Sequence, residues 1–234
     1  CHVSAASGHA FLCTCHAAHT LNSLHLQADW LLQHYNPVDA LYRVAYAAPS
    51  GGEALMLEII DGRGVNTLSE LKQRPHMLYL ASLAGWAEVV RRLLEIGMDP
   101  NGFRDMTPII IAADFGHTHV VVQLLQADPD LGRTELDGHT ALHFAAMEGH
   151  DSIVCMLVQA GGPVNARDCD GDTALHHACR NNHRAAVIEL LRHADIVVDV
   201  RNEDEETPLE VASKRGHDEI VTLLEQHGSF FGHA

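Results

Sequence analysis

The clearest pattern in this sequence is an apolar stripe that recurs along its second half. Val89, Val90, Leu93 and Leu94 are spaced i, i+1, i+4, i+5, which places all four side chains on one face of an α-helix. The same stripe returns in four later segments: Val120, Val121, Leu124 and Leu125; Ile153, Val154, Leu157 and Val158; Ala186, Val187, Leu190 and Leu191; and Ile220, Val221 and Leu224. The pattern therefore predicts five amphipathic helices in succession.

A shorter helix is predicted ahead of each stripe, most clearly from residue 140 onward. Thr140 is a typical helix N-cap residue, and Leu142, Ala145 and Ala146 follow it at helical spacing. Small residues such as the two alanines let another helix approach closely. Gly149 then suits the left-handed backbone that commonly ends a helix. Each unit is thus predicted to be a helix, a turn and a second helix.

The units repeat with a nearly constant period. Thr140 and Thr173 are 33 residues apart, Thr107 precedes Thr140 by 33 residues, and Thr207 follows Thr173 by 34. A fixed period in the low thirties is typical of stacked repeats. No single unit of this kind buries its apolar faces alone, so neighbouring units are expected to stack into one continuous core.

Short motifs at fixed places in each unit resemble the ankyrin repeat. They are Thr-Ala-Leu-His at 140–143 and 173–176, Gly-His at 116–117, 149–150 and 216–217, and Val-Asn-Ala-Arg-Asp at 164–168. The resemblance covers residues 76–227. It implies an all-α fold, an ankyrin-repeat solenoid of about six stacked helix-turn-helix units with β-turn fingers.

The pattern divides the chain into four segments. Residues 1–39 are predicted to form a degenerate repeat or N-terminal cap, and residues 40–75 a divergent repeat that lacks the Thr-Pro-Leu-His signature. Residues 76–228 are predicted to form five repeats, the last of which has a polar outer face because nothing stacks on it. Residues 229–234 are interpreted as a tail that carries Phe230 and Phe231.

Composition narrows the classes of partner. The 234 residues carry a formal net charge of -16, which disfavours nucleic acid and anionic membrane surfaces because an acidic surface repels both. No apolar run approaches the ~20 residues of a membrane-spanning helix. The six cysteines lack the spacing of a disulfide framework, which favours reduced thiols in the cytoplasm or nucleus. Because the chain begins at Cys1 without a methionine, we expect it to be a fragment of a longer chain. The repeats are expected to form a monomeric array or part of that larger chain.

The sequence offers little for metal or enzyme chemistry. Six of its 19 histidines occupy places where the resemblance implies structural hydrogen bonds: His117, His143, His150, His176, His183 and His217. The N-terminal group Cys13, Cys15, His16 and His19 contains zinc-ligand types but lacks paired knuckle spacing, so we interpret it as part of a cap. Phosphate-binding glycine loops, G-x-S-x-G and H-E-x-x-H are all missing. We therefore predict no metal site, no cofactor and no catalytic activity.

The resemblance implies that the fingers and the exposed face of each first helix form a concave binding surface. Four of the residues mapped there, Phe115, Met147, Leu136 and Met106, are typical interface anchors. The mapped partner-binding residues are Arg104, Asp105, Met106, Asp114, Phe115, Glu135, Leu136, His139, Met147, Glu148, Cys169, Asp170, Asp172, Arg180, Asn181, Glu203, Asp204, Glu206, Lys214 and Arg215.

Carboxylates dominate the predicted fingers: Asp105, Glu135, Asp170, Asp172, Glu203, Asp204, Glu205 and Glu206. A row of like charges favours a Lys/Arg-rich protein segment as partner. The alternative interpretation is that the acids only maintain solubility and that Phe115 packs between repeats.

The function predicted from these observations is a non-enzymatic protein-protein interaction module, acting as an adaptor or scaffold. The first alternative is that the array is the substrate-recruiting arm of a larger enzyme or ubiquitin ligase. A third hypothesis is a metal-sensing N-terminus that controls the array.

Overall fold

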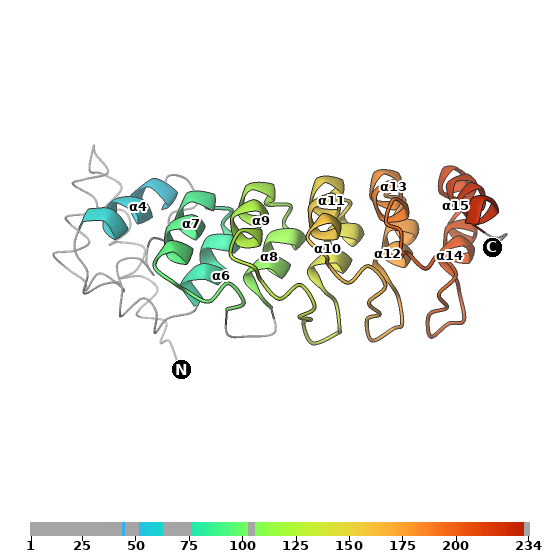
Figure 1. Ribbon diagram of the computed structural model, residues 1–234, viewed down its shortest axis with the longest axis horizontal. Helices are drawn as coiled ribbons and strands as arrows, with labels where there is room; N and C mark the ends of the chain where they lie inside the picture. Colours follow the sequence, from blue (N-terminus) through green and yellow to red (C-terminus); the bar gives the residue numbers. More distant parts are fainter. Residues whose placement is uncertain (1–43, 45–51, 63–75, 103–105, 232–234) are drawn as a thin grey trace, which may run out of the picture. The chain divides into compact units, whose positions relative to one another are not determined.

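The computed structural model describes residue 44 and residues 52–62, 76–102 and 106–231 of the chain (Figure 1). Over these ranges all regular structure is helical, in eleven helices. The all-α repeat solenoid predicted from the sequence is thereby confirmed. None of the described helices is long and apolar enough to cross a membrane.

The chain divides into two compact units, Cys1–Met98 and Asp99–Ala234. In the first unit α6 (His76–Leu83) contacts α7 (Ala87–Glu95), and α4 (Gly52–Gly62) also contacts α7. The Glu88 N–H at the start of α7 donates to Glu53 Oε1 of α4 across 3.1 Å. Burial of Val89, Val90 and Leu93 places the apolar stripe of α7 in the core.

The second unit contains four pairs of helices. The first helices of the pairs are α8 (Pro108–Asp114), α10 (Ala141–Glu148), α12 (Ala174–Arg180) and α14 (Pro208–Arg215). The second helices are α9 (Thr118–Leu125), α11 (Asp151–Gln159), α13 (Arg184–Leu191) and α15 (Asp218–Phe231).

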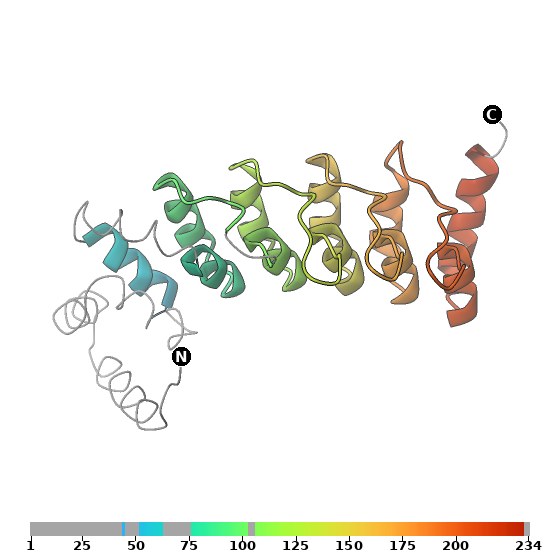
Figure 2. The ribbon, with the colours of Figure 1, turned by 90° about the horizontal axis from the view of Figure 1, so that it is seen from below.

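Within this unit the helices form two rows. Each first helix contacts the first helix of the next pair, and each second helix contacts the next second helix (Figures 1 and 2). The connections after α9, α11 and α13 all project from the same side of the helices (Figure 1). We call these three connections, residues 129–139, 162–172 and 195–206, the fingers. Because the rows are regular, equivalent residues of successive fingers lie next to each other.

The core lies between the rows and follows the predicted stripes closely. The first three positions of the stripe are buried in α9, α11 and α13, whereas the fourth position, Leu125, Val158 or Leu191, is only half-buried. Paired small residues of the first helices, such as Ala145 and Ala146, are completely buried, as close approach between helices requires. The stripes therefore form a continuous interior with a partly exposed edge.

Capping chemistry explains why the first helices begin where they do. Thr107 Oγ1 accepts from Ile110 N in α8, and Thr207 Oγ1 accepts from Glu210 N in α14. The carboxylate of Glu210 returns the bond by accepting from Thr207 N across 2.8 Å, which completes a capping box. The last helix, α15, continues to Phe231, three residues beyond Gly228, where we ended the last repeat.

The turn between the paired helices requires a left-handed residue. Gly116, Gly149 and Gly216 have φ of 70°, 74° and 75° there, and Asn182 takes the same place with φ of 61°. Asparagine is one of the few residues with a side chain that tolerate this conformation. The third pair therefore keeps the turn without glycine.

Candidate functional site

The fingers are organised by one residue placed five positions before each helix-capping threonine. In the first finger Glu135 accepts from the N–H groups of Asp137 and His139 at 2.9 and 3.2 Å. In the second finger Asp168 Oδ1 accepts from the backbone of Asp170 and Asp172 at 3.0 and 2.9 Å. The equivalent residue of the third finger has an amide side chain.

That residue is Asn202, whose Oδ1 accepts from the N–H groups of Asp204 and Glu206 at 3.1 and 2.9 Å. A short polar side chain that bonds the backbone two and four residues later stabilises a tight turn. Three different residues, Glu135, Asp168 and Asn202, therefore perform one structural task. Glu135, predicted from the sequence to bind a partner, therefore has a second, structural role that the repeat pattern did not indicate.

Neighbouring fingers are joined by hydrogen bonds. Cys169 N donates to Asp137 O and Glu203 N donates to Asp170 O, both at 2.9 Å. His143 joins the start of α10 to the next finger: its Nδ1 accepts from Thr140 N at 3.0 Å, so its Nε2–H donates to Ala166 O at 3.1 Å. These bonds hold each finger in place against the next.

Histidines also connect the first helices to the following repeat. His150, His183 and His217 place Nε2 at 3.1, 2.9 and 3.3 Å from the carbonyl oxygens of Asp114, Met147 and Arg180. His176 Nε2 likewise lies 3.1 Å from Glu206 O of the next finger. The structural role expected for these histidines is confirmed for the ones named here.

Burial of His143 makes the free energy of unfolding of the array depend on pH. Burial, with added repulsion from His177, lowers the pKa of His143 from 6.5 to about 4. Between these values a falling pH protonates this ring in the unfolded chain but not in the folded protein. Acidification from pH 7 to pH 5 is therefore expected to reduce the free energy of unfolding by about 2 kcal/mol through this residue. Urea unfolding at a series of pH values, with EDTA present, measures the effect.

His143→Gln is the matched control, because a glutamine amide can accept from Thr140 N and donate to Ala166 O. We expect its unfolding free energy to depend less steeply on pH between 6.5 and 4.5. An unchanged slope would contradict the assignment to His143.

Two large apolar residues of the predicted partner surface are exposed. Leu136, in the first finger, is 83% exposed, and Phe115, at the end of α8, is 53% exposed and stacked on His117. Phe115 is therefore not packed between repeats, which was the alternative interpretation. Met106 and Met147 are half-buried. These side chains are available to contact another molecule.

Asp172 requires a correction, because the sequence analysis placed it on the exposed partner surface. Its side chain is buried, and its Oδ2 lies 2.5 Å from Arg180 Nη1 while Oδ1 accepts from Asn202 Nδ2 at 2.8 Å. Burial opposes its charge, but the bonds from Arg180 and Asn202 keep the pKa of Asp172 below its ordinary value. Asp172 is an internal connection between repeats.

Other finger carboxylates also have partners within the chain. Glu206 pairs with Lys214, Glu135 lies 2.7 Å from His139 Nδ1, and Glu203 lies 3.7 Å from the exposed Arg167. The predicted acidic row is therefore weaker than the sequence suggests.

Negative charge remains at two adjacent places along the first helices. Burial raises the pKa of Asp114 above its ordinary value, and repulsion from Glu148 of the next repeat raises it further, whereas His150 opposes the shift. In the fingers, the carboxylates of Asp170, Asp204 and Glu205 also have no ion pair among the described residues. A cation placed between Asp114 and Glu148 would relieve their repulsion.

Several predicted positions are outside the described residues. Arg104, Asp105, the N-terminal Cys13–His19 group and the cap proposed for residues 1–39 are among them. The remaining mapped residues, Cys169, Asn181 and Arg215, are exposed.

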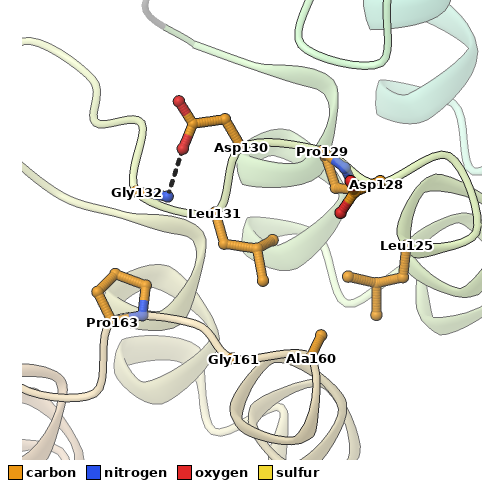
Figure 3. Close-up of a pocket in the computed structure, with 9 residues that line it drawn as sticks. All are labelled: Leu125, Asp128, Pro129, Asp130, Leu131, Gly132, Ala160, Gly161 and Pro163. Carbon is orange, nitrogen blue, oxygen red and sulfur yellow. Dashed lines mark hydrogen bonds between the residues drawn. The ribbon is translucent and has the colours of Figure 1, made fainter.

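The structure also contains a shallow pocket that the sequence analysis missed. It has a volume of about 560 Å³ and lies between the connections that follow α9 and α11. Figure 3 shows Leu125, Leu131 and Ala160 around one open space, with Asp130 Oδ1 accepting from Gly132 N at 3.0 Å. None of its lining residues belongs to the mapped partner-binding set. No sequence motif distinguishes it, because its wall is assembled from two repeats.

Comparisons with known proteins show which family the chain resembles in sequence. The family model described as ankyrin repeats (3 copies) matches residues 28–135, 78–168 and 142–232. Among curated proteins, the probable E3 ubiquitin-protein ligase XBOS32 of Oryza sativa subsp. japonica is 30% identical over 118 residues. This match includes 44% of the present chain and 24% of the relative's length.

Proposed function

Because this chain belongs to the ankyrin-repeat family, we propose that it is a non-enzymatic interaction module that holds a segment of a partner protein against its fingers and first helices. The carrying observation is the exposure of Phe115 and Leu136 in an array whose other large apolar residues are mostly buried. Aromatic and aliphatic anchors of this kind commonly contribute most of the binding energy at an interface. In this proposal the module acts as an adaptor or scaffold and has no catalytic residues.

The partner segment is proposed to carry Lys or Arg. The support for a basic residue is the repulsion between Asp114 and Glu148, which lie on consecutive repeats. Burial raises the pKa of Asp114, and the charge of Glu148 raises it further. The fingers give weaker support, because Glu135, Asp172 and Glu206 already have cationic or imidazole partners. We therefore place the basic residue over α8 and α10 and the apolar anchor beside Phe115.

A cytoplasmic or nuclear location forms part of this proposal. Cys155, Cys169 and Cys179 are free thiols, which is typical of proteins in reducing compartments.

The test compares partner capture by three forms of the chain that are first shown to be equally helical. Phe115→Ala combined with Leu136→Ala is expected to reduce capture of the specific partner at least tenfold, because one interface anchor contributes about 2 kcal/mol or more. Val122→Ala is the matched control, since Val122 is a half-buried apolar residue of α9, a second helix outside the fingers and first helices. Equal capture by all three forms would contradict the proposal.

A second candidate function is the substrate-recruiting arm of a ubiquitin ligase. The observation that favours it is the match to a probable E3 ubiquitin-protein ligase, of which this chain covers 24%. The endogenous protein, purified and supplied with ubiquitin, E1 and E2 enzymes, would then transfer ubiquitin. Transfer by that protein but not by residues 1–234 alone would support this candidate, and the absence of transfer by both would contradict it.

A further inference from the structure

Two histidines and a carboxylate from consecutive repeats meet beside the fingers. His139 Nε2, from the first finger, lies 3.2 Å from Asp168 Oδ2, in the second finger. His177 Nε2, from α12, lies 2.7 Å from the same oxygen. The three ligand atoms all lie within 4.8 Å of one another. His177 was not among the residues mapped from the sequence.

The surrounding bonds fix the orientation of the carboxylate and of one imidazole. Asp168 Oδ1 is occupied by the N–H groups of Asp170 and Asp172, which turns Oδ2 toward the two rings. His139 Nδ1 lies 2.7 Å from Glu135 Oε1. A carboxylate behind an imidazole is the usual outer partner of a histidine that ligates a metal, because it fixes the tautomer and the ring orientation.

The hydrogen on His139 Nδ1 leaves the contact between His139 Nε2 and Asp168 Oδ2 without a donor. The contact between His139 Nδ1 and Glu135 requires a hydrogen on Nδ1. In the neutral ring Nε2 then has a lone pair, which faces the oxygen lone pairs of Asp168. Two acceptors at 3.2 Å need a positive group between them, which is either a second ring hydrogen or a metal cation.

We propose that His139, Asp168 and His177 form a binding site for a Zn²⁺ ion. Imidazole nitrogen and carboxylate oxygen are zinc ligands, with bonds of about 2.0–2.2 Å, so neighbouring ligand atoms of a tetrahedral site lie roughly 3.3 Å apart. The separation between His139 and Asp168 already matches this spacing, whereas His177 Nε2 has to move about half an ångström away from Asp168 Oδ2. The 18% exposure of the His139 side chain leaves a route for water to the fourth position.

Charge balance supports a dication in this position. With both rings neutral, the carboxylates of Glu135 and Asp168 give the cluster two negative charges, which one Zn²⁺ cancels. His143 is not a ligand, because both of its ring nitrogens already have partners in Thr140 and Ala166. The ion would connect two fingers with α12 and so hold His139 fixed on the partner surface.

The experiment uses the full chain after EDTA treatment and removal of the chelator, with ZnCl2 as the probe. Calorimetric titration measures affinity and stoichiometry, and NMR of the histidine rings identifies the ligands. His139→Gln changes a ligand with a partly exposed side chain, so the fold is expected to be retained. Glu135→Gln changes the outer partner, and because Glu135 also accepts from the N–H groups of Asp137 and His139, circular dichroism first checks that this variant keeps its fold. His119→Gln changes an exposed histidine of α9 as a control. A Cys13→Ser and Cys15→Ser chain removes the N-terminal thiols.

The proposal predicts one zinc ion whose binding shifts the ring signals of His139 and His177. Glu135→Gln should weaken this binding about 10- to 100-fold, and His139→Gln at least as much. His119→Gln and the cysteine variant should retain it. Failure of the original chain to bind zinc at micromolar concentrations, or unchanged affinity in His139→Gln, would overturn the proposal and assign a second ring hydrogen to His139.

Discussion

Replacing Asp168 with alanine is expected to reduce the free energy of unfolding by about 3–5 kcal/mol, because several buried donors lose their acceptor at once and each costs roughly 1–3 kcal/mol. The Asp168 side chain is almost completely buried, and its two oxygens contact two backbone N–H groups and the Nε2 atoms of His139 and His177. Alanine leaves three buried donors, the N–H groups of Asp170 and Asp172 and His177 Nε2, without their acceptor. Urea unfolding in EDTA, followed by circular dichroism, measures the loss.

Two further substitutions separate the contributions of this residue. Asp168→Asn should cost less than alanine, because Asn202 organises the next finger with an amide oxygen in the same position. Asp170→Ala changes an exposed carboxylate of the same finger and should change stability by less than about 0.5 kcal/mol. If Asp168→Ala were as mild as Asp170→Ala, the organising role of Asp168 would be refuted.

The second large effect is expected from Gly149→Ala, which should cost about 2–4 kcal/mol. The residue has a φ of 74°, and a side chain in this left-handed conformation costs roughly 1–2 kcal/mol. The new Cβ would also lie 2.4 Å from His183 Nδ1. The ring therefore has to move, which weakens its hydrogen bond to Met147 O and adds an overpacking penalty of about 1–3 kcal/mol.

Gly216→Ala is the matched control for this substitution. Gly216 occupies the same helix end with a φ of 75°, but a Cβ added there meets no atom within 4 Å. It should therefore lose only the backbone contribution of about 1–2 kcal/mol. Thermal and urea unfolding of both variants measure the difference, and equal losses would show that contact with His183 has no energetic weight.

Removing a connection in the middle of the array also has a consequence for cooperativity. In stacked repeats stability is approximately a sum of terms for each repeat and for each interface between neighbours. Asp168 and His183 both belong to interfaces between neighbouring repeats, whereas Gly216 lies in the last repeat. We therefore expect Asp168→Ala and Gly149→Ala, which displaces His183, to broaden the unfolding transition as well as shift it.

The sequence by itself determined the repeated part of the fold because its signals are local. The stripe from Ile153 to Val158, the N-cap Thr140 and the left-handed Gly149 each act within one or two helical turns, and all three appear in the structure, with only Val158 at the edge of the core. Periodicity then fixed which residues are equivalent. Equivalence also placed Glu135, Asp168 and Asn202 at one position, although their common role in the fingers emerged only from their hydrogen bonds.

Only the tertiary structure decided how the charged and imidazole side chains pair. Asp172 was expected on the surface, yet it is buried against Arg180 of its own repeat and Asn202 of the next. His139 and His177 are 38 positions apart in the sequence and meet at Asp168 because stacking brings a finger beside the next first helix. A repeat pattern specifies which backbone positions become neighbours. The direction of a polar side chain depends on which donors and acceptors those neighbours present, and for Asp172 one of them, Asn202, comes from the adjoining repeat.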